Sequence, residues 1–97
     1  MAERFRPYVT VAAIVECRNK YLLVSEYDEA PTPVYGQVAG HLEANEDLIE
    51  GIKRELLEEV GIDADLKEVE FHSLGNCKIL GKSKMRYFYG YLYLAKT

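Results

Sequence analysis

The sequence predicts an α/β fold, in which a mixed sheet is covered by helix. Three observations predict it: the order of strands, one helix and further strands; a strongly amphipathic segment in the middle; and a strict alternation of side chains near the end. The 97 residues allow one domain, 1–97, with a modest core. The 48% hydrophobic and 29% charged residues are typical of a globular protein.

Runs of β-branched, aromatic or alternating residues predict five extended segments. These are residues 8–16, 21–26, 34–38, 64–74 and 84–95. Stretches rich in polar residues, Gly or Pro predict the connections between them. These connections are residues 18–20, 27–33 and 75–83. The first two strands are therefore expected to form a hairpin that precedes the helix.

One amphipathic helix is predicted between Asn45 and Gly61. The side-chain oxygen of Asn45 can accept a hydrogen bond from a free N–H of the first turn, so Asn45 is the expected N-cap. Gly61 fits the left-handed position just past the helix end. At about 100° per residue the apolar residues form a single stripe. They are Leu48, Ile49, Ile52, Leu56 and Val60.

Three carboxylates of this helix, those of Glu55, Glu58 and Glu59, fall within an arc of about 100° that overlaps the apolar stripe. Desolvation and mutual repulsion disfavour their charged forms, so they either take up protons or are neutralised by a cation. Their hard oxygens at this spacing suit Mg²⁺ or Mn²⁺. The chemistry predicted is metal-assisted attack of water on a phosphate. A solvated, glutamate-rich helix is the alternative for so short a pattern.

A longer pattern, G-x5-E-x7-R-E-L-x-E-E-x-G-I, covers residues 40–62. It resembles the Nudix box, the signature of the Nudix hydrolase family, at every defining position. These positions are Gly40, Glu46, Arg54, Glu55, Leu56, Glu58, Glu59, Gly61 and Ile62. Even if only seven of these nine positions are counted, each near 7% frequency, a chance match is on the order of 10⁻⁸ per starting position. The segments PYVTVAAIV and AGHLEANE look most similar to the NudJ-type branch, whose members are phosphatases of nucleoside di- and triphosphates and of a thiamine-precursor pyrophosphate.

The resemblance implies a Nudix-type α/β/α sandwich and a set of site residues. The implied metal ligands are Glu55, Glu58, Glu59 and the backbone carbonyl of Ala39. Arg54 is implied to orient a glutamate of the motif. Gly40, Glu46 and Gly61 are implied to be structural. Many members of the family have proline where this chain has Val38.

The expected reaction is Mg²⁺-dependent cleavage of a phosphoanhydride bond, with Mn²⁺ as a substitute. The substrate is expected to be a nucleoside di- or triphosphate or a related diphosphate, with water attacking phosphorus. Either Glu58 or Glu55 is the general base, and Glu58 is favoured. Two alternatives stay open: a catalytically weak or inactive Nudix-like module that binds a nucleotide or a partner, and an ADP-ribose or dinucleotide pyrophosphatase.

The last predicted strand carries the candidate substrate-binding residues Lys84, Arg86 and Tyr87. Alternation places four tyrosines on one face, at positions 87, 89, 91 and 93. One interpretation is a central strand covered on both sides. The other is a tyrosine wall that stacks a base or heteroaromatic ring, with Arg86 or a nearby lysine on a phosphate. His41 is expected in a loop.

The net charge of −4 is unevenly distributed. Residues 40–62 hold seven acids and two bases, whereas residues 78–97 hold five bases and no acid. This suits a cation and a small polyanion better than a nucleic acid. No apolar run approaches the ~20 residues of a membrane span, and the N-terminus has no signal-peptide core. With only Cys17 and Cys77, both expected to be buried or neutral thiols, a cytoplasmic location is predicted.

Nudix domains usually continue for several tens of residues beyond a strand such as the one that ends near Ala95. We therefore expect that this chain, which ends at Thr97, is C-terminally truncated and lacks the second helix layer. One face of the sheet would then be bare and apolar, and would favour homo-oligomers.

Overall fold

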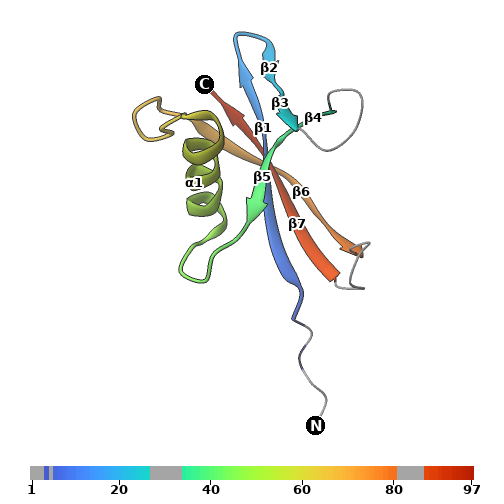
Figure 1. Ribbon diagram of the computed structural model, residues 1–97. Coiled ribbons are helices and arrows are strands. Elements are labelled where there is room, and N and C mark those ends of the chain that lie inside the picture. Colours follow the sequence, from blue (N-terminus) through green and yellow to red (C-terminus); the bar gives the residue numbers. More distant parts are fainter. Residues whose placement is uncertain (1–3, 5, 27–33, 81–86) are drawn as a thin grey trace.

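The computed structural model describes residues 4, 6–26, 34–80 and 87–97 (Figure 1). Two short antiparallel strands form a separate ribbon, and the remaining strands share one sheet. The elements in chain order are β1 (Tyr8–Cys17), β2 (Lys20–Leu22), β3 (Val24–Glu26), β4 (Val34–Gly36), β5 (Val38–His41), α1 (Leu48–Val60), β6 (Glu70–Leu80) and β7 (Tyr87–Lys96).

The main sheet is mixed, as predicted. Its strand order is β2-β1-β7-β6, and β5 pairs with β1 on the edge that β2 also uses. β1 and β7 run parallel, so residues from opposite ends of the chain become neighbours, such as Tyr8 with Phe88 and Thr10 with Gly90. The other pairings are antiparallel. The parallel pair needs a long crossover, and α1 and β6 lie within it.

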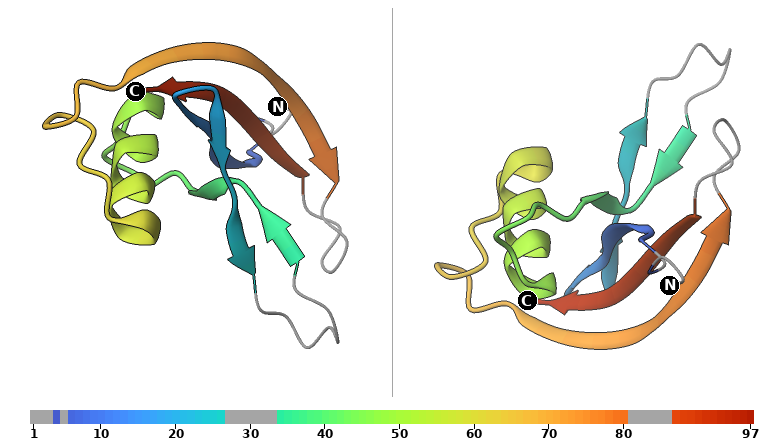
Figure 2. Two further views of the ribbon diagram at one scale, coloured as in Figure 1. Left: turned by 90° about the horizontal axis from the view of Figure 1, so that it is seen from above. Right: turned by 90° about the horizontal axis from the view of Figure 1, so that it is seen from below.

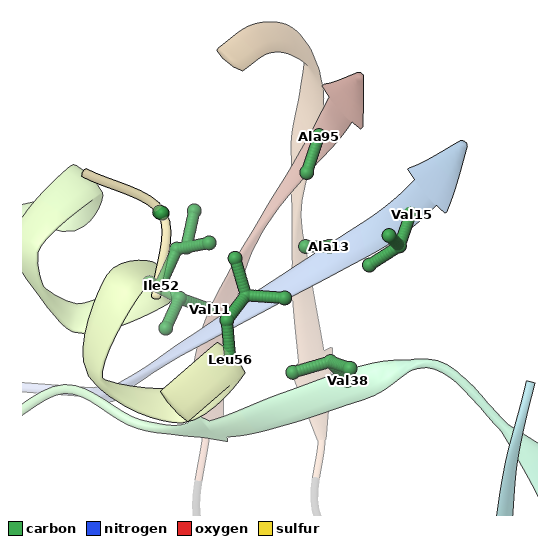
Figure 3. Close-up of a cluster of buried hydrophobic side chains, with 8 residues drawn as sticks. Val11, Ala13, Val15, Val38, Ile52, Leu56 and Ala95 are labelled. Carbon is green, nitrogen blue, oxygen red and sulfur yellow. The ribbon is translucent and has the colours of Figure 1, made fainter. Parts of the chain in front are cut away.

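Helix α1 packs on one face of this sheet, beside β5 and β1 (Figures 1 and 2). Its stripe residues Ile52 and Leu56 are 1% and 0% exposed, which confirms the predicted core-facing side. They meet alternate residues of the strands in one cluster (Figure 3). The buried apolar residues are Val11, Ala13, Val15, Val38, Ile52, Leu56, Ala64 and Ala95.

The opposite sheet face, which we call the open face, carries no helix among the described residues. Alternation along β1 and β7 places six half-buried residues on it. They are Thr10, Ala12, Ile14, Gly90, Leu92 and Leu94. The predicted absence of a second helix layer is thus observed in the described part of the chain. The predicted homo-oligomer stays a prediction.

Two predicted boundaries were wrong because strand pairing overrides local sequence. Residues 75–80, predicted as part of a loop, continue β6, since the ladder with β7 extends from Glu70 to Leu80. Gly75, with φ of +143°, lies at a register shift after Ser73, so the glycine forms a bulge rather than ending the strand. The segment 64–69, predicted as extended, is a turn region before β6.

The first hairpin is confirmed, with a break in its second strand. Arg18 and Asn19 have φ of +51° and +63°, the left-handed values of a two-residue type I′ connection. The predicted strand 21–26 divides into β2 and β3 around Leu23. The predicted loop at 27–33 lies outside the described residues.

Two smaller expectations also needed correction. Of the two alternatives for the cysteines, buried or neutral thiols, the buried one is wrong, since Cys17 and Cys77 are both exposed. His41 is the last residue of β5 rather than a loop residue, because it pairs with Thr10. Within the described ranges, no helix is long and apolar enough to cross a bilayer.

Candidate active site

The start of α1 is set by Asp47, not by the predicted Asn45. Asp47 has extended backbone angles, and its Oδ1 accepts a hydrogen bond from the Glu50 N–H at 2.8 Å. This contact satisfies one of the free donors of the first turn. It also holds the pKa of Asp47 below its usual value, chiefly through the hydrogen bonds from Glu50. The helix therefore begins at Leu48.

The end of α1 is as predicted. Gly61 has φ of +71°, and its N–H donates to the Leu57 carbonyl at 3.1 Å. The next N–H, that of Ile62, donates to the Leu56 carbonyl at 3.2 Å. These bonds satisfy carbonyls that the helix itself leaves free. Both ends of the acidic helix are therefore held by local contacts.

Arg54 is the centre of the charged site. Its Nε and Nη2 donate to the two oxygens of Glu46 at 2.6 and 2.9 Å, a bidentate pair. Its Nη1 donates to Glu55 Oε1 at 2.7 Å and to Glu58 Oε2 at 3.3 Å. Its Nη2 also donates to the His41 carbonyl at 2.8 Å. One guanidinium thus ties α1 to the loop before it and to β5.

These contacts shift the pKa values of both partners in the expected directions. The hydrogen bonds to Glu46 raise the pKa of Arg54 well above its ordinary range, with a further contribution from Glu55. The hydrogen bond from Arg54 holds the pKa of Glu46 below 4.5, and the N–H of Glu43 adds to the effect at 2.9 Å. Glu46 and Arg54 therefore form a stable ionic connection, which fits the structural role implied for Glu46.

Glu55 is the one buried acid among the described residues, at 8% exposed. Its carboxylate lies directly over Gly40 of β5, in the space that a Cβ at position 40 would occupy. Gly40 is therefore needed for the close approach of strand and helix. Inside α1, an added Cβ at Gly51 would lie 2.7 Å from Leu42 Cδ1, the end of a side chain in the segment between β5 and α1. The glycine at 51 serves packing.

Glu58 and Glu59 lie on the exposed side of the same helix turn. The Glu58 side chain is 59% exposed and reaches Arg54 only at 3.3 Å. Within the described ranges, no group of three Asp, Glu, His or Cys side chains is already arranged as a metal site. Arg54 neutralises part of the charge of Glu55 and Glu58. The repulsion between the carboxylates is thus reduced by a neighbouring side chain, in addition to the two ways predicted from the sequence, protonation and a bound cation.

The donor chemistry nevertheless fits a hard divalent cation. The Arg54 contact shows that the His41 carbonyl faces away from β1, toward the outer side of β5. Carbonyl directions repeat every second residue along a strand, so the Ala39 carbonyl faces the same side. Carboxylate and carbonyl oxygens are the ligands that Mg²⁺ prefers.

Of the three predicted substrate-binding residues, the structure describes only Tyr87, the first residue of β7. Tyr87 shares the helix-side face with Tyr93 and Ala95, and Tyr93 packs against the core. Lys78 Nζ lies 4.6 Å from the centre of the Tyr87 ring, near the hairpin end. The tyrosine face is therefore partly core, as in the first of the two interpretations. Lys84 and Arg86 lie outside the described residues.

Three rings that the sequence did not bring together meet beside the site. Tyr8 and Phe88 are stacked, with ring centroids 5.5 Å apart, and the His41 ring lies 5.9 Å from that of Phe88. They come from β1, β7 and β5, and the pairings of β1 with β7 and with β5 make them neighbours. The only sign of this group in the sequence is the alternation along β7, which places Phe88 on the sheet face opposite the tyrosines.

Comparison with known proteins places this arrangement in a family. The model of the NUDIX domain matches residues 4–96. "Phosphatase NudJ" of Escherichia coli and of Shigella flexneri are each 48% identical over 60 residues. That match covers 62% of this chain but 39% of the relatives, so the matched stretch spans well under half of their length.

Solved structures show the same fold. A Nudix hydrolase from Nitrosomonas europaea is 32% identical with a TM-score of 0.71, over 94% of this chain and 59% of the other. The dihydroneopterin triphosphate pyrophosphohydrolase of E. coli has a TM-score of 0.77 at 15% identity, over 95% of this chain and 71% of the other. At that identity the second likeness concerns the fold alone.

Proposed function

The chain belongs to the Nudix family, and from this we propose that it hydrolyses a phosphoanhydride bond of a nucleoside di- or triphosphate or a related diphosphate, using Mg²⁺. The observation that carries the proposal is the acidic turn of α1, held by Arg54 against the outer side of β5. Mn²⁺ is the expected substitute, because it accepts the same oxygen ligands.

Glu55, Glu58, Glu59 and the Ala39 carbonyl would hold the metal. When bound, the ion neutralises phosphate charge and lowers the pKa of a coordinated water. Arg54 positions two of these residues, because it bonds Glu55 and Glu58 through the same Nη1. Gly40 leaves the space in which the Glu55 carboxylate lies. These residues therefore place several anionic oxygens beside the outer edge of β5.

Glu58 is the residue that we assign as general base. Its carboxylate is more exposed than that of Glu55, at 59% against 11%, and its contact with Arg54 is longer. It can thus reach a water molecule beside a bound phosphate and take its proton. Glu55 is already engaged by Arg54 at 2.7 Å and serves better as a fixed ligand.

The test is turnover of a panel of nucleoside di- and triphosphates, ADP-ribose and dinucleoside polyphosphates, with and without Mg²⁺. We expect Mg²⁺-dependent release, with kcat of Glu58→Gln at least about 100-fold lower. Glu50→Gln, on the same helix but outside the Arg54 contacts, is the matched control. Full turnover by Glu58→Gln would remove Glu58 from catalysis.

The products separate the alternative functions. Inorganic phosphate from a nucleoside diphosphate indicates a phosphatase, the name that the NudJ relatives carry. AMP with ribose 5-phosphate indicates ADP-ribose cleavage. Calorimetric binding of nucleotide without turnover at any Mg²⁺ concentration would indicate a binding module and would overturn the hydrolase proposal.

A further inference from the structure

The guanidinium of Arg54 has two sides with different partners. Its Nε and Nη2 donate to the carboxylate of Glu46, and Nη2 also donates to the His41 carbonyl. Its Nη1 donates to Glu55 and Glu58, at 2.7 and 3.3 Å. One side of the guanidinium therefore connects α1 with the loop and β5, and the other lies against two of the expected metal ligands.

The charge on the Nη1 side acts on the same carboxylates that would hold a divalent ion. A guanidinium keeps its charge at any working pH, and the Arg54 side chain is only 20% exposed, so water and salt screen it poorly. Two cations that share a carboxylate lie a few ångströms apart and repel each other. For a univalent and a divalent charge about 6 Å apart, this repulsion weakens ion binding about tenfold even at the dielectric constant of water.

The positions of the two carboxylates depend on Arg54 only in part. Glu55 and Glu58 are three residues apart on α1, so helix geometry fixes their spacing. Glu55 is also held by packing, since it is 8% exposed and lies over Gly40 of β5. The Glu58 side chain is 59% exposed and has little order to lose. Removal of the Arg54 charge should therefore strengthen metal binding, because the lost repulsion outweighs the lost order.

The other base of α1 provides a contrast. Lys53 is adjacent to Arg54 in sequence, but its Nζ bonds Asp65, in the turn region after the helix, at 2.7 Å. The two side chains of this pair are 37% and 77% exposed, so water screens their charges. Lys53 and Arg54 thus carry the same charge on one helix and differ in the groups on which that charge acts.

We propose that Arg54 lowers the affinity of the site for Mg²⁺, because its guanidinium and the ion compete for the charge of Glu55 and Glu58. Arg54 thereby sets the Mg²⁺ concentration at which these carboxylates hold the ion. An arginine that only orients a glutamate has the opposite effect, since its loss weakens metal binding. The proposal rests on the proposed function for the assignment of the metal ligands.

Binding of Mn²⁺ without substrate tests the proposal, with free Mn²⁺ measured by electron paramagnetic resonance at pH 8 and low salt. We expect Arg54→Gln, which removes the charge but keeps an N–H donor, to lower Kd about tenfold. Arg54→Lys keeps the charge and loses the planar fork, so its Kd should stay within about twofold of that of the unmodified chain. Lys53→Gln is the matched control, because it removes the same charge one residue away, and its Kd should change less than about twofold.

A higher or unchanged Kd in a folded Arg54→Gln would overturn the proposal, as would an Arg54→Lys that binds Mn²⁺ as tightly as Arg54→Gln does. If the unmodified chain binds Mn²⁺ but hydrolyses no phosphoanhydride, the hydrolase proposal fails and the comparison of Kd values still decides this one. Failure of the unmodified chain and of all three variants to bind Mn²⁺ would overturn both.

The unmodified chain gives a second test that needs no folded variant. Competition is reciprocal, so a bound ion weakens the hydrogen bonds from Nη1 to Glu55 and Glu58. We expect saturating Mg²⁺ to speed hydrogen exchange of the Nη1 protons at least about threefold, measured by ¹⁵N NMR of the guanidinium. The Nε proton, which bonds Glu46 at 2.6 Å, should keep its exchange rate and is the internal control. Equal Nη1 exchange with and without Mg²⁺ would contradict the competition.

Discussion

The two faces of the main sheet are made from alternate residues of the same strands, yet they differ in almost every property. On β1, Val11, Ala13 and Val15 are at most 5% exposed beneath α1, while Thr10, Ala12 and Ile14 on the open face are only half-buried. The described carboxylates and bases with shifted pKa values all belong to α1 or the loop before it. The difference shows that burial under α1, not membership of a strand, decides how much a side chain contributes to stability.

The largest expected effect is on the packing of the helix side. Leu56→Ala should lower the free energy of unfolding by about 3 kcal/mol, because Leu56 is fully buried and the cavity cannot be filled by water. Leu92→Ala on the open face should cost under about 1 kcal/mol, since its side chain is only half-buried. Urea unfolding measures both, and equal losses would contradict the difference between the faces.

The second expected effect is on thermal stability, and it compares a partly buried ion-pair network of α1 with an exposed ion pair of the same helix. Arg54→Met should lower Tm less than Leu56→Ala does but clearly more than Lys53→Met. Arg54 is 20% exposed and bonds carboxylates that are 11–12% exposed, whereas the Lys53–Asp65 pair is 37% and 77% exposed. A screened surface pair contributes little. The Tm values of both variants are measured by thermal unfolding in low and high salt. Equal losses of Tm for Arg54→Met and Lys53→Met would refute the central role of Arg54.

The smallest effect is on the pH dependence of stability. The folded pKa of Glu46 lies below its ordinary 4.5, chiefly because of Arg54. The stability that this contact provides is therefore fully present above pH 4.5 and is lost as pH falls through the folded pKa. Glu46→Gln lacks this contribution, so its difference from the unmodified chain should shrink as pH falls below 4.5. Urea midpoints between pH 3 and pH 7 test this, and a constant difference would contradict it.

Much of the helix could be predicted because its signals are local. The 3.6-residue period of Ile52 and Leu56 and the left-handed Gly61 depend on neighbours within a turn or two. The N-cap was misassigned to Asn45, because Asn45 and Asp47 are both good caps and only the chain path selects one. The strand β6 was cut short at Gly75, because a bulge and a loop look alike until the pairing strand is known.

The positions of the three glutamates on one side of α1 can be predicted from the sequence, but their contacts with Arg54 cannot. The arc of Glu55, Glu58 and Glu59 follows from helix geometry alone. That Arg54 bonds four groups, from the loop, α1 and β5, depends on how the helix docks on the sheet. A sequence gives spacing along one helix, whereas the contact between a guanidinium and a distant carbonyl needs the packed structure.

By itself, the sequence determined the acidic helix, its apolar stripe and its resemblance to the Nudix box, because each depends on residues at most about 20 positions apart. The tertiary structure decided which strand faces which side and which distant rings meet. Tyr8, His41 and Phe88 become neighbours only through the parallel pairing of β1 with β7 and the antiparallel pairing of β1 with β5. Such pairings depend on burying whole faces at once, and no local pattern encodes them.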